Sequence, residues 1–430
     1  MRHFASHRKG NPRQGNLPFV GLVCLILLSS IGFGQSLLRI GDKPPYTLKT
    51  IDAPFASVLE VDSFVVLSKN RVAIKSTQQP GFRLYTAKLE ALSSMPVEEV
   101  RPGNGGVYPF RFEGLWGLAD SMGKVIVKPK FTDAGVYSEG RIGLRDESCW
   151  GFANKTGKWL IKPKYHCEIE DVRPEFSCNR ALVYDPGSGG WKYIDTEGKF
   201  INQRAYPMAF PFRYNHAWVQ ENDGFYLINQ QGEIKLGPFL DIVPDPGSPL
   251  VPYLKNDLFG FVDVSRAKLL TNAEFLEVSG HHLGTAAVLT TKGWTLLDAS
   301  GKTCTLDYFE SLEFAEEGVF VYTSGEPEDR WAGITDRKCM IIVPAIWKSI
   351  GTYHQGVAAA TKNGIQYELI DLDGNTLLNG QKFDRCSNPV GGCMIVQLDG
   401  KQQIAHLKEG ALVSELVFPL SESLKIVPLN

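Results

Sequence analysis

Aromatic residues recur along this chain at spacings of 34 to 41 residues, and short apolar runs recur with them. The first set of positions is Phe82, Trp116, Trp150, Trp191, Phe225, Phe259, Trp294, Trp331 and Tyr367, with Ile404 as a degenerate last member. A second set follows roughly 15 residues later, at Phe131, Tyr165, Tyr206, Phe239, Phe275, Phe309, Trp347, Phe383 and Phe418. Repetition at a fixed period predicts a tandem array of one structural unit.

Within one unit, the alternation of apolar and turn residues predicts β-structure. Residues 115–119 form a short strand, residues 120–123 a turn that ends in Gly123, and residues 124–127 a β-branched second strand. We expect Pro129 to interrupt the ladder because proline has no N–H to donate. Residues 141–145 then form a third strand. Later units repeat the turn with Asp or Asn first and Gly fourth, and the Asp or Asn side chain tightens it by accepting backbone N–H groups.

Three segments identify a family resemblance. They are LWGLADSMGK (115–124), CWGFANKTGK (149–158) and WKYIDTEGK (191–199), the first two followed by IVKPKF and LIKPKY. The sequence resembles the WG-repeat (KWG-repeat) family of bacteria over most of residues 80–420. Later units depart from the motif, with Phe225-Tyr226, Phe259-Gly260, Trp294-Thr295 and Trp331-Ala332 in the place of Trp-Gly. The resemblance implies architecture and little chemistry, since that family has no single established function.

The expected fold is therefore all-β, with about ten units of about 35 residues. Residues 35–80 form an entry or capping β-segment, and residues 81–430 form the repeat array. Two arrangements are compatible with the repeats, an open β-solenoid or superhelix and a propeller-like ring. About ten units exceed the usual four to eight blades of a propeller, which favours the open array.

The first 34 residues predict an export signal. Basic residues at positions 2, 8, 9 and 13 precede an apolar run over residues 17–33, and small residues precede a cleavage point near residues 34–35. The run is short for a spanning helix, which needs about 20 residues, so an uncleaved anchor is the lesser alternative. Lipidation of Cys24 is disfavoured because bulky Val23 precedes it. We expect an exported protein of the periplasm or cell surface, without membrane insertion after cleavage.

Charge and cysteine content add two limits. The formal net charge is −2, and loss of the four basic residues of the signal leaves about −6, which argues against a nucleic-acid partner. Export permits disulfides among the eight cysteines. Cys386 and Cys393, and likewise Cys167 and Cys178, are near enough in sequence to pair. The alternative is that most cysteines are small apolar strand residues, as expected for Cys304 and Cys339 in the second strands of their units.

The sequence contains no recognisable catalytic motif, and we expect no catalytic residue, cofactor or metal. It has no His-Glu-x-x-His, no Gly-x-Ser-x-Gly, no phosphate loop and no Cys-x-x-Cys. The pair His281-His282 is unsuited to joint metal binding because neighbouring residues on a strand face opposite ways. Residues 371–375 look like the start of a calcium loop, but they align with the ordinary repeat turn and lack the later acidic ligands.

The remaining aromatic residues and the longer units supply the candidate binding residues. The periodic residues Trp116, Trp150, Trp191, Trp294 and Trp331 are expected in the core. Trp218, beside Tyr214 and His216, is a candidate stacking face for a sugar ring, and the alternative is a half-buried strand residue. Insertions at residues 174–178 with 185–189, at 241–252 and at 324–330 are candidate recognition loops, since insertions in arrays occur in loops.

These observations favour a non-enzymatic binding or scaffold protein of the bacterial cell envelope that holds a protein partner. A glycan or cell-wall binding module that uses Trp218 and Tyr214 is the alternative. A hydrolase with carboxylates gathered at one end of the array is a third, lesser hypothesis.

Overall fold

The computed structural model divides the chain into two units, residues 1–32 and residues 33–430. It describes residues 36–428 except 42–43, 51–57, 69, 77–80, 93–95, 167–171, 246, 280–283, 305–307, 317, 327, 354–355, 391–392, 407–410 and 420–422. The predicted export signal, Cys24 and the pair His281-His282 lie outside the described residues. All that follows concerns the second unit.

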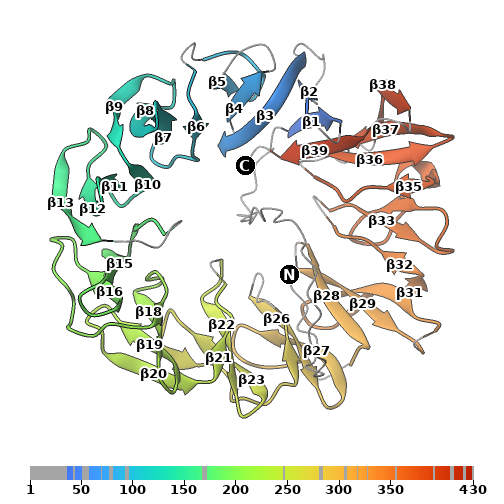
Figure 1. The fold of residues 1–430 in the computed structure, drawn as a ribbon. Coiled ribbons are helices and arrows are strands. Elements are labelled where there is room, and N and C mark those ends of the chain that lie inside the picture. The colour runs from blue at the N-terminus through green and yellow to red at the C-terminus, as the bar shows by residue number, and fades with distance from the viewer. Residues whose placement is uncertain are drawn as a thin grey trace, which may run out of the picture. The chain divides into compact units, whose positions relative to one another are not determined.

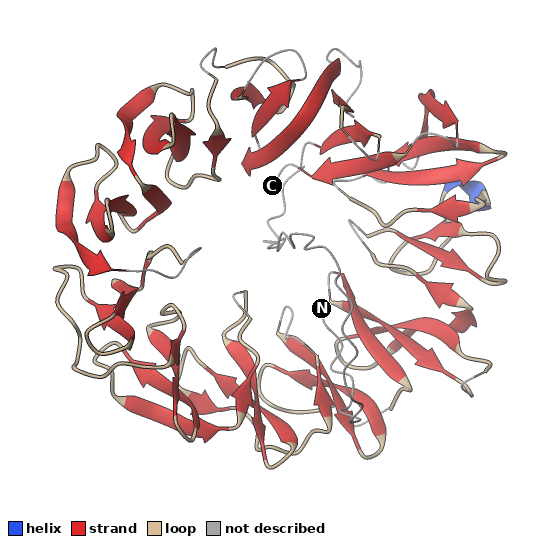
Figure 2. Ribbon diagram, in the orientation of Figure 1, coloured by secondary structure: helices blue, strands red, loops and turns tan. Residues whose placement is uncertain are grey.

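This unit consists of ten antiparallel sheets, which we number as blades 1 to 10 in chain order (Figures 1 and 2). Blade 1 contains β39 (Leu424–Pro428), β1 (Ser36–Ile40), β2 (Tyr46–Thr50), β3 (Val58–Ser68), β4 (Arg71–Ser76) and β5 (Phe82–Thr86), in that order. Blade 2 contains β6 (Glu99–Val100), β7 (Val107–Phe112), β8 (Leu115–Asp120) and β9 (Val125–Phe131). Blade 3 contains β10 (Asp133–Ser138), β11 (Arg141–Asp146), β12 (Cys149–Ala153) and β13 (Trp159–His166).

The middle blades have three or four strands each. Blade 4 contains β14 (Phe176–Ser177), β15 (Arg180–Asp185) and β16 (Gly190–Ile194). Blade 5 contains β17 (Met208–Ala209), β18 (His216–Glu221), β19 (Gly224–Asn229) and β20 (Ile234–Phe239). Blade 6 contains β21 (Asp241–Ile242), β22 (Leu250–Lys255), β23 (Leu258–Asp263) and β24 (Lys268–Leu269), and blade 7 contains β25 (Glu277–Val278), β26 (Thr285–Thr290) and β27 (Gly293–Asp298).

The last blades follow the same plan. Blade 8 contains β28 (Ser311–Glu316), β29 (Val319–Ser324), β30 (Trp331–Asp336) and β31 (Ile341–Trp347). Blade 9 contains β32 (Ser349–Ile350), β33 (Ala358–Thr361) and β34 (Glu368–Ile370), followed by the 3₁₀ turn η1 (Leu378–Gly380). Blade 10 contains β35 (Arg385–Cys386), β36 (Cys393–Leu398), β37 (Lys401–His406) and β38 (Ala411–Pro419). Among the described residues, no helix is long and apolar enough to cross a membrane.

The blades form a closed ring, a ten-bladed β-propeller (Figure 1). Strand β39, at the C-terminal end of the chain, pairs antiparallel with β1, from Ser36 opposite Pro428 to Ile40 opposite Leu424. The all-β repeat fold is therefore confirmed in its ring form, and the preference for an open array is wrong. The number of blades usual for propellers therefore does not predict whether this array closes. Here the two ends of the chain pair as strands of one sheet.

The hydrophobic core lies between blades. Within the described residues, each of the nine junctions from blade 1–blade 2 to blade 9–blade 10 has a cluster of buried side chains contributed by both blades. At the junction of blades 2 and 3, for example, Trp116 and Phe131 pack with Ile142 and Leu144. A blade buries its apolar face against the next blade, so no blade has a complete core of its own.

The two aromatic sets of the sequence are cross-strand partners. The pairs are Trp116–Phe131, Trp150–Tyr165, Trp191–Tyr206, Phe225–Phe239, Phe259–Phe275, Trp294–Phe309 and Tyr367–Phe383. Such pairs stabilise a sheet directly because their side chains lie side by side on one face. The period read from the sequence is thus the number of residues between equivalent pairs in successive blades.

The same pairing shows why Gly follows Trp in the motif. A Cβ atom on Gly117 would lie 2.6 Å from the carbonyl oxygen of Val127 and 2.9 Å from the nitrogen of Pro129. Gly151 meets Ile161 and Pro163 in the same way. The outer strand bulges across the glycine. The ladder is therefore interrupted at Pro129, as expected, although β9 itself continues to Phe131.

Three further expectations need correction. Trp347 pairs with Ala332, so Ala332-Gly333 occupies the Trp-Gly position, and Trp331 precedes it. Phe418 pairs with Gln402, so Ile404 is two residues beyond the anchor. The register predicted from the sequence is wrong in blade 8 because Trp331 stands next to the true anchor position. It is wrong in blade 10 because the anchor position, Gln402, has no aromatic residue. Trp116 and Trp150 are buried as expected, whereas Trp191, Trp294 and Trp331 are only half-buried.

Each sequence unit also straddles two blades. Its first two strands, such as β8 and β9, complete one blade, and its third, β11, belongs to the next. The candidate entry segment, residues 35–80, contributes β1 to β4 to the same sheet as β5 and β39. The sequence period alone predicts the order of the strands, but it does not predict which strands belong to the same sheet.

The closing strand pair predicts the effect of a short truncation. Removal of residues 424–430 deletes β39 and leaves β1 paired with β2 alone among the described strands. We expect the free energy of unfolding in urea to fall by about 3–5 kcal/mol, because five residue pairs are lost at roughly 0.5–1.5 kcal/mol per hydrogen bond. Removal of residues 429–430 alone keeps β39 and serves as the control. Equal stability of the two truncated proteins would contradict a stabilising role for closure.

Candidate ligand-binding surfaces

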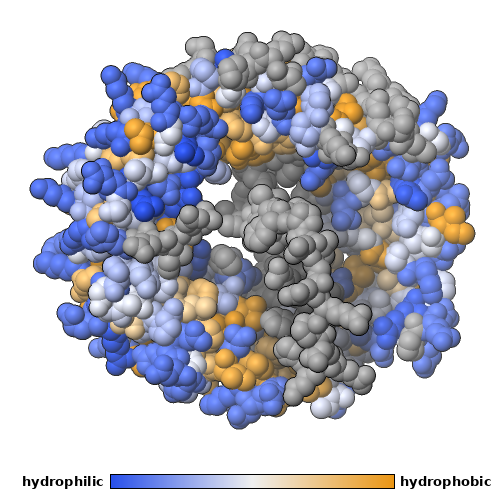
Figure 3. Space-filling model, viewed as in Figure 1, coloured by the Kyte–Doolittle hydropathy of each residue, from blue (hydrophilic) through white to orange (hydrophobic). Residues whose placement is uncertain are grey.

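A cavity of about 260 Å³ lies between blades 5 and 6. Its walls come from β18, from the β17–β18 loop and from the β21–β22 loop. The lining residues are Phe210, Pro211, Arg213, Tyr214, His216, Trp218, Pro244, Asp245, Ser248, Val251 and Val264. Figure 3 shows, on the face visible there, apolar surface gathered over the blades in the lower part of the view, where β18 to β23 lie in Figure 1.

The β17–β18 loop places two polar groups at the cavity through a tight hairpin. Tyr214 and Asn215 both have positive φ, 50° and 65°, as a two-residue hairpin turn requires. Backbone hydrogen bonds of 2.7 and 2.9 Å between Arg213 and His216 close the turn. The Nδ1 atom of His216 lies 3.0 Å from the carbonyl oxygen of Tyr214, which holds the imidazole against the loop.

The insertion at residues 241–252 forms the opposite wall. The Asp245 carboxylate accepts the backbone N–H of Gly247 at 2.8 Å, and its carbonyl accepts the N–H of Ser248 at 3.2 Å. The buried Ser248 hydroxyl accepts the N–H of Leu250 at 3.1 Å. These bonds define the loop shape locally. One predicted recognition loop and the predicted stacking residues therefore meet at one cavity.

The other predicted loops lie elsewhere. Residues 185–189 and 324–330 join the second and third strands of their blades, at β15–β16 and β29–β30. In an antiparallel sheet these turns lie at the opposite end from the turns that join the first and second strands. Residues 174–178 include the short strand β14. These insertions do not contribute to the cavity between blades 5 and 6.

Trp218 and Tyr214 take different positions at this cavity. Trp218 is 4% exposed and packs edge-to-face on Phe239, with ring centroids 5.9 Å apart. Its indole N–H is buried and has no hydrogen-bond partner among the described residues. Tyr214 is 40% exposed at the hairpin tip. Trp218 is thus neither an open stacking platform nor a half-buried strand residue, and only Tyr214 presents an accessible aromatic side chain.

The chemistry of the lining suits recognition of a small ligand. Arg213, His216, Asp245 and the Tyr214 hydroxyl provide polar groups beside walls of Phe210 and Trp218. A few polar groups on a largely apolar wall are typical of ligand sites. Among the described lining residues Asp245 is the single carboxylate, whereas glycoside hydrolysis typically uses two.

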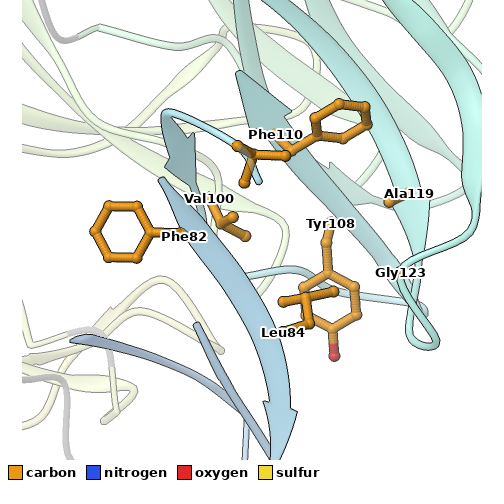
Figure 4. Close-up of a pocket in the computed structure, with 8 residues that line it drawn as sticks. Phe82, Leu84, Val100, Tyr108, Phe110, Ala119 and Gly123 are labelled. Atoms are coloured by element: carbon orange, nitrogen blue, oxygen red, sulfur yellow. The ribbon is translucent and has the colours of Figure 1, made fainter. Parts of the chain in front are cut away.

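A second cavity, between blades 1 and 2, is a packing gap. Its volume is about 20 Å³, close to that of one water. Figure 4 shows Phe82 and Leu84 on one side and Val100, Tyr108 and Phe110 on the other. The lining is apolar and belongs to the core of this junction, so it offers no ligand site.

The outer strand of blade 8 has an unusual surface. In β31 the outward residues are Ile342, Pro344 and Ile346, which alternate with buried Val343 and Trp347. Met340 and Ile341, just before them, are also exposed, by 54% and 50%. β31 is the last strand of its sheet and pairs only with β30 among the described residues.

The equivalent strands of blades 2 and 3 carry charge at these positions. In β9 the outward residues are Ile126, Lys128 and Lys130, with the same burial pattern as β31. In β13 the corresponding residues are Leu160, Lys162 and Lys164. Lysine on an edge strand discourages pairing with another chain. Blade 8 replaces both lysines, by Pro344 and Ile346, and so leaves an uncharged apolar edge.

Titratable residues elsewhere show no assembled centre. Among the described residues, no group of three or more His, Cys, Asp or Glu side chains is placed to hold a metal ion. The Asp371 carboxylate accepts the backbone N–H groups of Asp373 and Asn375 at 3.0 and 2.8 Å. It therefore serves the repeat turn, as Asp120 does at Met122 and Lys124.

The burial of Trp218 predicts how the two aromatic residues differ on mutation. Trp218→Ala should lower the free energy of unfolding by about 3–5 kcal/mol, because it opens a cavity in the junction of blades 5 and 6. Tyr214→Ala should change it by less than about 0.5 kcal/mol, as is usual for an exposed side chain. Urea titrations of the two variants test this. Similar losses in both would contradict the assigned positions.

Comparisons with known proteins complete the description. A family model described as "WG containing repeat" matches residues 116–146, 150–166 and 191–225. No curated protein matches the sequence.

Several solved structures resemble the fold at low identity. A eukaryotic initiation factor is 10% identical, with 92% of this chain and 98% of that chain covered and a TM-score of 0.41. Apo AztD from Citrobacter koseri is 12% identical, with 92% and 98% covered and a TM-score of 0.27. PorZ of Porphyromonas gingivalis, a bacterial surface component of the type-IX secretion system, is 13% identical, with 81% and 51% covered and a TM-score of 0.27.

The three family-model matches begin at the anchor residues Trp116, Trp150 and Trp191 and contain their cross-strand partners. They confirm the resemblance read from the motifs. The chain carries WG-containing repeats at three places, consistent with a WG-repeat family.

Proposed function

We propose that this protein is a non-enzymatic binding protein of the bacterial cell envelope, which holds a protein partner along β31. The observation that carries the proposal is the apolar outer edge of blade 8. Ile346 is exposed by 48% where blades 2 and 3 carry Lys130 and Lys164, and Ile342 on the same edge is exposed by 37%. The partner we propose is an extended segment of another protein with alternating apolar side chains.

Two kinds of contact favour such a partner. An added strand gains main-chain hydrogen bonds from the unpaired side of β31, and its apolar side chains cover Ile342 and Ile346. The neighbouring residues Met340 and Ile341 extend the apolar surface. The two faces of the blade 8 sheet already pack against blades 7 and 9. Binding at the outer edge of this sheet therefore requires no rearrangement of the ring.

The envelope location rests on the sequence. A basic segment followed by a 17-residue apolar run and small residues near positions 32–34 has the form of a secretory signal. An exported chain meets partners in the periplasm or at the cell surface. Removal of the signal gives a mature chain without this apolar run.

Substitution on β31 tests the proposal. A photoreactive amino acid at position 346 should cross-link one specific envelope protein, and the same label at position 130 on β9 should not. The cross-linked protein is then purified, and its affinity for the full chain is measured. Ile346→Lys should weaken that affinity at least tenfold, about 1.4 kcal/mol, because it restores a charged edge.

The matched control is Leu160→Lys, which adds the same charge to the exposed face of β13. It should leave the affinity unchanged. An unaltered affinity in Ile346→Lys, or an equal loss in both variants, would refute binding at β31. A dimer of this chain that dissociates on Ile346→Lys would show self-association in place of a separate partner.

A second candidate function is glycan binding at the cavity between blades 5 and 6. The observation that favours it is the cavity itself, where accessible Tyr214 lies beside Arg213, His216 and Asp245. A volume of about 260 Å³ is slightly below the usual range of small-molecule sites and fits a single sugar ring.

Tyr214→Ala provides the test, because it alters the rim without removing the buried wall. The wild-type protein should bind peptidoglycan or a member of a soluble glycan panel, and Tyr214→Ala should weaken that binding about tenfold, since the accessible ring contact is lost. Tyr308→Ala removes a tyrosine of similar exposure, 41%, outside the cavity and should have no effect. Absence of binding across the panel, or equal effects of the two variants, would exclude this function.

A further inference from the structure

In six blades the turn after the third-position strand, which leads to the outer edge of the blade, follows one pattern. Its fourth residue is Gly at positions 123, 157, 198, 232, 301 and 374, with φ between 77° and 84°. Blade 8 has the same turn, since the Asp336 carboxylate accepts the N–H groups of Lys338 and Met340 at 2.8 Å each. Here the fourth residue is Cys339, with φ of 60°. A side chain in this left-handed conformation carries strain that glycine avoids.

In the repeats this turn position faces the preceding blade. A Cβ atom on Gly157 would meet Val127 of blade 2 at 2.8 Å, and one on Gly374 would meet Val343 of blade 8 at 2.6 Å. The side chain of Cys339 therefore enters the junction with blade 7. At that junction blade 7 supplies a second cysteine, Cys304.

The contacts bring the two thiols together. The Thr295 hydroxyl donates to the carbonyl oxygen of Cys304 at 3.1 Å and lies 3.9 Å from Sγ of Cys339. The Cys304 thiol is 3.7 Å from the carbonyl oxygen of Arg337, in the turn that contains Cys339. Burial, together with the neighbouring Cys339 thiol, raises the pKa of Cys304 to about 12. Both cysteines are free thiols in this structure.

Two departures from the repeat thus coincide at one junction, a cysteine in the glycine position and a cysteine opposite it. We propose that Cys304 and Cys339 are a disulfide site that links blade 7 to blade 8. The oxidant is a disulfide, either a protein or a small molecule. In the cell the reaction rests on the proposed export, since exported compartments permit disulfides.

The reaction balances as two exchange steps. The thiolate of the partly exposed Cys304 attacks one sulfur of the donor disulfide and releases one donor thiol. The Cys339 sulfur then attacks the Cys304 sulfur of this mixed disulfide and releases the second donor thiol. Two protein thiols are oxidised, one donor disulfide is reduced, and the two protons pass to the donor thiols. Because the raised pKa leaves little Cys304 thiolate at neutral pH, the rate rises with pH.

The bond would constrain the turn that leads directly into β31. It closes a loop between the two blades and restricts the unfolded chain, which raises stability. Of the pairs suggested by sequence spacing, Cys386–Cys393 is not favoured, because Cys386 lies opposite Val396 on β36, three residues from Cys393. Cys167 lies outside the described residues, so the pair Cys167–Cys178 stays a prediction.

The experiment oxidises the full chain, purified in the reduced state, with oxidised glutathione at pH 8.5. Wild-type protein should lose the mass of two hydrogens and yield one cross-linked peptide pair that contains residues 304 and 339. Its midpoint of thermal unfolding should rise by about 5 °C relative to the reduced form. Cys339→Gly, which restores the turn residue of the other blades, should fold yet show neither the cross-link nor the rise.

Cys149→Ser is the matched control, because it removes a half-buried thiol away from this junction and should retain both effects. A cross-link between other cysteines, no cross-link at all, or an equal rise in Cys339→Gly would overturn the proposal. None of these measurements involves a binding partner, so the failure of binding at β31 and the failure of the disulfide are separate results.

Discussion

The pairing of β1 with β39 is the constraint on which the ring depends. Among the described residues, apolar side chains of both neighbours are buried together at each junction from blades 1–2 to blades 9–10, so one blade covers an apolar face of the next. An open array of such units leaves two uncovered ends. Antiparallel pairing of the first and last strands places β39 in the blade 1 sheet, in contact with β36 of blade 10, so the two ends of the array meet. Ten blades are therefore compatible with a ring, although ten exceeds the number usual for propellers.

Within a blade, the aromatic pair and the glycine together set the course of the outer strand. Trp150 lies opposite Tyr165, and Gly151 leaves room for the bulge that brings the chain past Pro163. The bulge allows the outer strand to alternate buried aromatic residues with outward lysines. In blade 8 the outer strand has nearly the same burial pattern as in blades 2 and 3 but no outward lysines, so its outer edge is apolar. A motif that serves folding thus provides, by a change of two outward residues, a candidate binding surface.

The candidate site shows how far sequence reasoning reached. Tyr214 and Trp218 were selected because they fall outside the repeat, and the insertion at residues 241–252 because it lengthens a unit. The structure places all three at one cavity. Sequence reasoning misjudged Trp218, because a tryptophan on a second strand is indistinguishable in sequence from one that faces solvent. It missed the β31 edge, although the replacement of two lysines is visible once the strands are aligned.

The sequence by itself determined the all-β class, the period, the turns and the two sets of aromatic residues, because each depends on residues close together in the chain. Tertiary structure decided the rest. Closure depends on a rotation between blades that sums over ten junctions, and no local pattern encodes that sum. The register at Ala332 and Gln402 depends on which residue the outer strand meets. The meeting of Cys304 with Cys339 requires two blades to pack, since 35 residues separate them in sequence.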